Sequence, residues 1–204
     1  MLLVSDHPAM RAGLAQVIDS EPGLHAELAD PAMVSSTPPS ADVVLLDSPL
    51  SSHDPFGVCH ELKQLAIPRR VAVYSHGARE ELALAAWVAG ADALIEKEAP
   101  ASVLFEQLRV VARGGRVLAS PSALALTAAA RELDPAERVV FGMCVYGVTL
   151  EEISRTLRRD PLEVEATVRR LIRRLSGPRP PAYPPHGRTP GRGCSPSREP
   201  ARPR

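Results

Sequence analysis

The chain is predicted to be an α/β protein, with a doubly wound parallel five-stranded sheet followed by a small all-α unit. Over residues 1–116, short apolar runs alternate with helical stretches, which is the pattern of a parallel sheet covered on both faces. Over residues 133–176, three helix starts follow one another with no strand between them. This change of pattern predicts two structural units in one chain.

The strands are predicted from five short apolar runs. The third run, Val43 to Leu46, consists of four apolar residues and indicates a strand buried on both faces. The predicted strands are Leu2–Val4, Leu24–Leu28, Val43–Leu46, Val71–Tyr74 and Ala93–Ile95. The predicted helices cover residues 8–20, 56–66, 79–90 and 101–113, with a short element at 31–35.

The all-α unit is predicted from three helix starts of one type. Each offers a capping side chain and a glutamate three residues later, and two of them have proline at the first helical position. They are Asp134-Pro135-Ala136-Glu137, Thr149-Leu150-Glu151-Glu152 and Asp160-Pro161-Leu162-Glu163. The third helix carries an apolar stripe at helical spacing, made of Val164, Val168, Leu171, Ile172 and Leu175.

Two further segments differ in composition from these units. Residues 117–132 are rich in alanine and predict a linker that is partly helical. Residues 177–204 are dense in Pro, Gly and Arg, cannot bury a core, and predict a disordered tail. Residues 1–118 hold nine basic and fifteen acidic side chains, whereas residues 176–204 hold six arginines and one glutamate.

The bulk composition excludes several classes of protein. No apolar run is long enough for a membrane span, and the N-terminus lacks a basic segment followed by a long apolar region. We therefore expect a cytoplasmic protein without a membrane partner. The widely spaced cysteines Cys59, Cys144 and Cys194 give neither a metal pattern nor a disulfide framework.

Four polar residues fall at the carboxyl ends of predicted strands, where sites in such sheets are usually built. They are Asp6, Asp47, Ser75 and Lys97. Two neighbouring carboxylates favour a hard cation such as Mg²⁺ between them. A hydroxyl and an ammonium group could hold the oxygens of a phosphoryl group on one carboxylate. The alternative is that all four are ordinary strand-end turn residues.

Five separated motifs resemble those of a NarL/FixJ-type response regulator. They are VSDHPAMRAGL, DVVLLD, VAVYS, AGADALIEKEAP and the helical pattern after residue 132. The resemblance implies a CheY-like, flavodoxin-like receiver domain at 1–116 and a LuxR-type helix-turn-helix domain at 133–176. It covers nearly all of residues 1–175.

The resemblance also implies roles for the strand-end residues. Asp47 corresponds to the phosphoacceptor and a metal ligand, and Asp6 to a second metal ligand. Ser75 corresponds to the switch hydroxyl and Lys97 to the lysine that contacts the phosphate. Pro49 could offer its backbone carbonyl to the metal.

Three departures from the family pattern suggest a degenerate pocket. Ser5 stands where the family has an acidic residue, which predicts weakened Mg²⁺ binding. Pro49 comes two residues after Asp47 instead of four, so that the loop must follow a different path. Leu94 replaces the aromatic switch residue. We therefore expect weakened or absent phosphorylation.

The resemblance implies that the helix at 161–175 enters the major groove of promoter DNA. If the apolar stripe packs inward, five residues face outward: Glu165, Ala166, Arg169, Arg170 and Arg173. Arginines on such a face can hold phosphates or recognise guanine edges, whereas Glu165 would be repelled by a phosphate. The alternative is a solvated, charged helix face.

These observations predict an atypical DNA-binding transcriptional regulator of the two-component type, and not an independent enzyme. The expected partners are promoter DNA, a sensor histidine kinase and a second copy of the chain. One alternative is an interaction module that sequesters a kinase or regulator without binding DNA. Another is a ligand-gated regulator that uses the altered receiver pocket.

Overall fold

The computed structural model describes residues 1–34, 41–51, 53–65, 67–77 and 79–177 of the chain. The predicted disordered tail covers residues 177–204, and residues 178–204 lie outside the described residues. Among the helices that are described, none is both long and apolar enough to cross a membrane.

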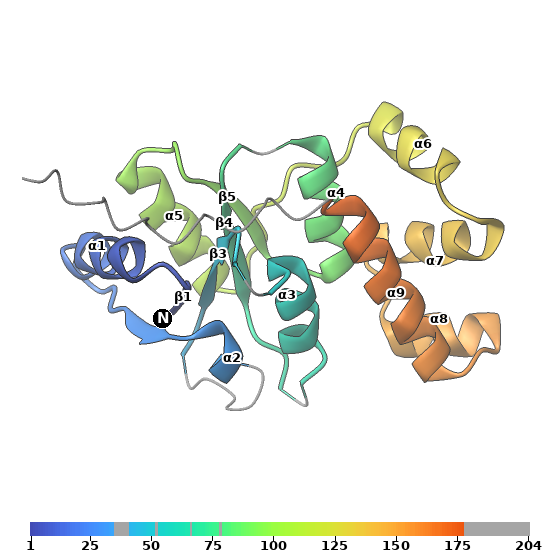
Figure 1. Ribbon diagram of the computed structural model, residues 1–204, viewed down its shortest axis with the longest axis horizontal. Helices are drawn as coiled ribbons and strands as arrows, with labels where there is room; N and C mark the ends of the chain where they lie inside the picture. The colour runs from blue at the N-terminus through green and yellow to red at the C-terminus, as the bar shows by residue number, and fades with distance from the viewer. Residues whose placement is uncertain (35–40, 52, 66, 78, 178–204) are drawn as a thin grey trace, which may run out of the picture.

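The N-terminal half forms the predicted five-stranded parallel sheet, and the fold class is confirmed (Figure 1). The strand order is β2-β1-β3-β4-β5. The strands are β1 (Leu2–Val4), β2 (Glu27–Ala29), β3 (Val44–Ser48), β4 (Val71–Ser75) and β5 (Ala93–Glu96). We call residues 1–116, with the helices that cover this sheet, the α/β unit.

Four of the five predicted strands have different bounds in the structure, and of these β4 and β5 are each one residue longer than predicted. The second begins at Glu27 instead of Leu24 and pairs only with β1, from Leu2 to Val4. The third continues through Asp47 and Ser48, because β4 pairs with it as far as Ser75. Asp47 and Ser75 therefore lie within their strands, and the prediction that they follow these strands was wrong.

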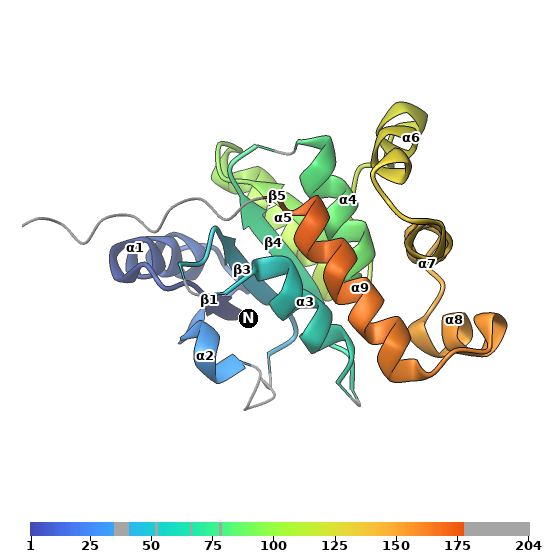
Figure 2. The same cartoon turned by 45° about the vertical axis from the view of Figure 1, so that its right-hand side comes forward.

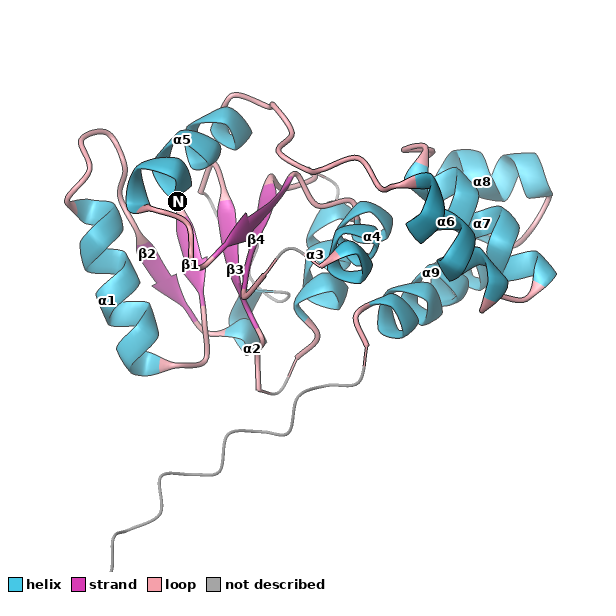
Figure 3. Ribbon diagram, turned by 90° about the horizontal axis from the view of Figure 1, so that it is seen from above, coloured by secondary structure: helices cyan, strands magenta, loops and turns pink. Residues whose placement is uncertain are grey.

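The helices cover both faces of the sheet (Figure 3). They are α1 (Pro8–Asp19), α2 (Pro31–Val34), α3 (Pro55–Lys63), α4 (Glu80–Ala89) and α5 (Ala101–Ala112). One buried apolar cluster joins the sheet to α1 and α5, and a second joins it to α3 and α4. The predicted positions of these helices agree with the structure to within three residues at each end.

The C-terminal half is helical, as predicted. Its helices are α6 (Ala123–Arg131), α7 (Pro135–Val145), α8 (Leu150–Leu157) and α9 (Pro161–Leu175). Asp134 and Thr149 form the predicted capping boxes. Asp160 caps α9 through the backbone N–H of Leu162, so the third start is not a capping box. We call residues 133–176 the helical unit.

Helix α9 belongs to the core of both units. Its side chains Val164, Val168, Leu171 and Ile172 are buried in an apolar cluster that also contains residues of α3 and α4. The helix packs against α7 and α8 on one side and against α4 and α3 on the other, which Figure 2 shows. The two units are therefore joined by a continuous apolar interface.

The linker is tied to the edge of the sheet. The backbone N–H of Leu94 donates to the Val117 carbonyl at 3.2 Å, and that of Val117 donates to the Asp92 carbonyl at 2.7 Å. Trp87 Nε1 of α4 donates to the carbonyl of Ala119 at 2.9 Å. The Arg116 guanidinium stacks 4.6 Å from the centre of the Trp87 ring. These contacts fix the start of the linker against β5 and α4.

We predict that Leu171→Asp destabilises the helical unit, because Leu171 is fully buried and the change buries an unpaired carboxylate at a cost of several kcal/mol. The melting temperature of α-helical circular dichroism should fall by roughly 10 °C. The matched control is Leu162→Asp on the same helix, where the side chain is 78% exposed and the melting temperature should be unchanged. Equal melting curves for wild type and Leu171→Asp would refute this core assignment.

Candidate functional site

Asp47 lies at the centre of a closed polar pocket. Its carboxylate is fully buried, and each oxygen has its own partner. The Ser5 hydroxyl at the end of β1 donates to Oδ2 at 2.6 Å, and Lys97 Nζ, just after β5, lies 2.5 Å from Oδ1. The sheet therefore brings together Asp47 and Lys97, two of the four residues that sequence analysis placed at strand ends, with Ser5 as their neighbour.

The surroundings of Lys97 hold its ammonium group next to the Asp47 carboxylate. Its backbone N–H donates to the carbonyl of Ser75 at 2.9 Å, which extends the pairing of β4 with β5. Its Nζ lies 5.7 Å from the centre of the Tyr74 ring. Burial and the negative charge of Asp47 raise the pKa of Tyr74. A buried carboxylate is stable only with such partners, because removal from water costs several kcal/mol for each ion.

Asp6 is held separately from Asp47. Its Oδ2 accepts a hydrogen bond from the backbone N–H of Ser51, in the loop between β3 and α3. Its Oδ1 lies 3.6 Å from Nδ1 of His7. Asp6 thus fixes this loop against the start of α1.

The pocket as arranged does not fit Mg²⁺. Both oxygens of Asp47 are engaged by Ser5 and Lys97, and one oxygen of Asp6 is engaged by a backbone N–H. Within the described ranges, no group of three or more His, Cys, Asp or Glu side chains could hold a metal ion. A cation would need the Lys97–Asp47 ion pair to separate first.

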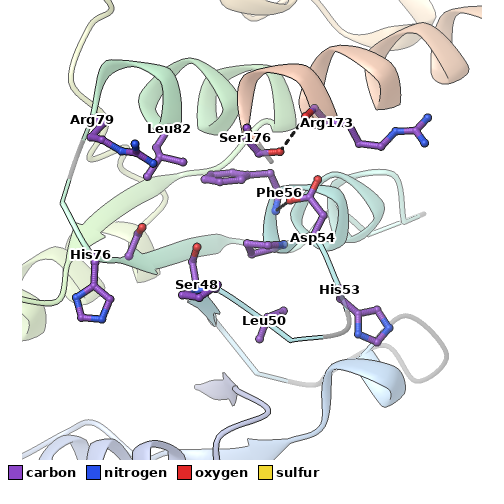
Figure 4. A pocket seen from close by; sticks show the side chains of 14 residues that line it. Ser48, Leu50, His53, Asp54, Phe56, His76, Arg79, Leu82, Arg173 and Ser176 are labelled. Carbon is purple, nitrogen blue, oxygen red and sulfur yellow. Dashed lines mark hydrogen bonds between the residues drawn. The ribbon is translucent and has the colours of Figure 1, made fainter. Parts of the chain in front are cut away.

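The other predicted pocket residues lie beside this ion pair. Ser75 is the last residue of β4 and is buried. Pro49 and Ser75 both line a neighbouring cavity, shown in Figure 4. Leu94, in the place of the aromatic switch residue, is half-buried beneath the linker, where its N–H bonds to Val117.

The predicted DNA-facing side of α9 is turned partly toward the α/β unit. Glu165 Oε2 lies 3.0 Å from Nε2 of His60 on α3, and His60 is buried. Arg169 Nη1 lies 2.9 Å from Oε1 of Glu61 on α3, and its Nε donates to Glu165 at 2.8 Å. The prediction that Glu165 faces outward is therefore wrong for this structure, because α3 covers it.

The remaining residues of the predicted face are exposed. Arg170 lies 3.5 Å from the buried carboxylate of Glu137 on α7, so it also supports the fold of the helical unit. Arg173 donates only to the carbonyl of Arg169 and has no carboxylate partner among the described residues. Ala166 is exposed on the same helix.

The electrostatics of the contact between α9 and α3 favour the ionised forms of Glu165 and Arg169. Burial acts to raise the pKa of Glu165, but the charge of His60 and the hydrogen bonds from Arg169 and His60 outweigh it, and the pKa is lowered. The hydrogen bond to Glu165 raises the pKa of Arg169. Glu165 thus remains ionised, and its contribution to the contact is lost only when the pH falls below the usual range of a carboxyl group.

Sequence reasoning missed His60 and Glu61 as contacts of α9. One signal was present in α4, where Leu and Ala side chains are buried on all sides of the helix from Leu82 to Ala89. A helix that is apolar all round is buried on all sides, so it needs a cover besides the sheet. This pattern indicates that another element packs on α4, although it does not identify α9.

The chain is similar to known response regulators over most of its length. It is 24% identical to the nitrate/nitrite response regulator protein NarL of Escherichia coli over 190 residues, which cover 86% of this chain and 88% of that protein. It is 27% identical to the DNA-binding transcriptional activator DevR/DosR of Mycobacterium tuberculosis over 189 residues, covering 86% and 87%. No protein-family model matches the chain.

Solved structures of response regulators are also similar to this chain. The response regulator ChrA of a heme-sensing two-component system superposes with a TM-score of 0.50 and 25% identity, covering 83% of this chain and 86% of ChrA. RcsB of Salmonella typhimurium superposes with a TM-score of 0.53 at 15% identity, covering 89% and 94%, and supports the fold alone.

The polar pocket lies at the carboxyl ends of a five-stranded sheet, and a unit of helices follows this sheet in the chain. The chain is therefore similar to NarL-type response regulators over most of its length.

Proposed function

We propose that this protein is a DNA-binding transcriptional regulator that the structure presents in a closed form. The receiver takes residues 1–116, the linker 117–132 and the DNA-binding domain 133–176. The similarity to DevR/DosR, a DNA-binding transcriptional activator, supports this assignment. The expected partners are promoter DNA, a sensor histidine kinase and a second copy of the chain.

In the closed form, α9 is packed on α3 and α4 of the receiver, and this packing is the single observation that supports the proposal. A recognition helix must lie in the major groove to contact base edges, and a helix buried against another domain cannot do so. Glu165 and Arg169 are both engaged with α3. DNA binding therefore requires α9 to separate from the receiver.

Separation would present a basic face to DNA. Arg169 would lose its Glu61 partner and join Arg173, which has no carboxylate partner among the described residues. Arginines on a recognition helix hold phosphates or pair with guanine. Arg170 supports this face from its position next to Glu137, and Ala166 leaves room for close approach to a base.

We infer that Asp47 accepts a phosphoryl group only weakly. Its carboxylate is buried and already neutralised by Lys97, and the Ser5 hydroxyl holds the other oxygen. A phosphodonor must displace both partners before it reaches the nucleophile. After transfer, Lys97, which contacts the Asp47 carboxylate, and Ser75, which pairs with Ser48 on the neighbouring strand, are the candidate groups to hold the phosphoryl oxygens. Once the Lys97–Asp47 ion pair has separated, Asp6, Asp47 and Pro49 are the candidate metal contacts.

We predict that acetyl phosphate with Mg²⁺ labels the wild type slowly and does not label Asp47→Ala. Ser5→Asp should be labelled faster, because a second carboxylate beside Asp47 competes for Lys97 and provides another oxygen for a cation. Intact-mass measurement over time gives the result, with a typical phosphorylatable receiver as the positive control. If neither the wild type nor Ser5→Asp gains mass, Asp47 is not a phosphoacceptor.

We predict that Glu61→Gln increases affinity for a mixed-sequence DNA duplex, because it removes the ion pair that holds Arg169 on α3. The pair is solvent-exposed, so the gain should be small, roughly 1.5- to 5-fold. Glu165→Lys should give a larger gain, since it removes the His60 contact and adds a positive charge near DNA. Fluorescence anisotropy at low salt measures both.

The matched control is Glu106→Gln on α5, an exposed glutamate far from α9 with the same change of charge. It should leave the DNA affinity unchanged. A gain with Glu165→Lys but none with Glu61→Gln would show that the Glu61–Arg169 ion pair does not restrain α9. No gain with either would exclude α9 from the DNA interface.

A further inference from the structure

A cavity of about 790 Å³ lies between the receiver and the end of α9. Its volume is within the range of about 300–1,000 Å³ that is usual for small-molecule sites. The receiver contributes the loops after β3 and β4 and the starts of α3 and α4, whereas α9 contributes its last turn (Figure 4). The walls of the cavity therefore belong to both domains.

Most of the wall is apolar. Leu50, Phe56 and Leu82 are buried and line the cavity together with Pro49 and Pro55. Such a surface favours an apolar body, because its burial removes apolar area from water on both partners.

Two hydroxyl groups on the wall have no internal partner. The side chains of Ser48 and Ser75 are more than nine-tenths buried. Within the described part of the chain, neither hydroxyl makes a hydrogen bond. Figure 4 shows the Ser48 hydroxyl directed into the cavity. Neither hydroxyl oxygen is among the fully buried unpaired atoms of the described residues, so both are open to the cavity and available to a polar group of an occupant.

The charges at the cavity favour a negative group. Arg79, at the start of α4, lies beside Leu82 at one end, and its side chain has no hydrogen bond or ion pair to any described residue (Figure 4). Arg173 runs along α9, away from the cavity. The acidic member, Asp54, is occupied as the N-cap of α3 and accepts from the N–H of Phe56.

The two histidines at the rim do not change this balance. His76 Nδ1 lies 2.7 Å from Oε1 of the exposed Glu98, so this histidine has a partner outside the cavity lining. His53 lies at the opposite end of the cavity from His76. Arg79 therefore remains the charged group best placed to bind a ligand.

We propose that this cavity binds an anionic amphiphile, a small molecule with an aryl or alkyl body and one carboxylate or sulfonate group. The body lies against Phe56 and Leu82, the anionic group contacts Arg79, and the Ser48 and Ser75 hydroxyls donate to it. A guanidinium with free N–H groups suits such an oxyanion.

The ligand is coupled to DNA binding because α9 forms part of the wall. A molecule that contacts Ser176 and Gly177 as well as the receiver binds best when α9 is docked. It therefore shifts the population toward the closed form, and DNA in turn weakens its binding. This coupling rests on the proposed function, whereas the binding itself does not.

The test uses two probes with the same aryl body, anilinonaphthalene sulfonate and its uncharged relative N-phenylnaphthylamine. Calorimetric titration of the full chain should give one saturable sulfonate site. Arg79→Gln should weaken the sulfonate roughly tenfold, the worth of one charge-assisted hydrogen bond, and leave the uncharged probe unaffected. The matched control Arg113→Gln, at the exposed end of α5, should bind both probes as the wild type does.

A second variant tests the wall from α9. Ser176→Phe, at the half-exposed C-cap of α9, should narrow the cavity and weaken both probes without loss of helical circular dichroism. No saturable binding, or equal sulfonate affinity in wild type and Arg79→Gln, would overturn the anionic site. Unchanged binding in Ser176→Phe would overturn the role of α9.

The coupling is measured separately. A probe concentration that just saturates the wild type should lower its DNA affinity in fluorescence anisotropy, and the same concentration should have a smaller effect on Arg79→Gln. An unchanged DNA affinity in the wild type would overturn the coupling. If the chain binds no DNA either with or without probe, the proposed function and the coupling are both rejected. The calorimetric result for ligand binding does not depend on that outcome.

Discussion

The arrangement of the whole molecule depends on the burial of one helix, α9, by two different domains. Its apolar stripe forms the centre of the helix-turn-helix through Val164 and Val168, and the same cluster continues into α3 and α4 of the receiver through Phe56 and Leu82. Helix α4 is apolar on every side, so it would expose a large apolar surface if α9 left it. The closed contact is therefore stabilised mainly by removal of apolar surface from water. The ion pairs at Glu165 and Arg169 determine how α9 is oriented on α3.

The polar pocket and this interface share one segment of chain. The loop after β3 is held by Asp6 at the backbone N–H of Ser51, and it leads directly into α3. Helix α3 carries both His60 and Glu61, the two receiver residues that contact α9 through ion pairs. Any change at Asp47 that moves this loop would act on the helix that holds Glu165. The structure thus provides a short physical connection between the buried ion pair and α9, the proposed recognition helix.

The alternation of apolar runs and helices was enough to predict the sheet, since periodicity is a local property of the chain. It also located Asp47, Ser75 and Lys97 near the ends of neighbouring strands. It could not give the length of β3, because the pairing of Ser48 with Ser75 depends on the neighbouring strand. Nor could it show that Ser5 and Lys97 each take one oxygen of Asp47, because that depends on distances between residues far apart in the sequence.

The sequence alone determined the α/β unit, the three-helix unit and the apolar stripe of α9, because capping residues and side-chain periodicity act within one element. Only the tertiary structure decided what that stripe packs against. A helix with a wide apolar face satisfies the same local pattern whether one domain or two cover it. The choice depends on the surface of α4 and on His60 and Glu61, more than a hundred residues away from their partners in the chain. Such contacts leave no local signal, and so the closed position of α9 and the cavity beside it were visible only in the folded chain.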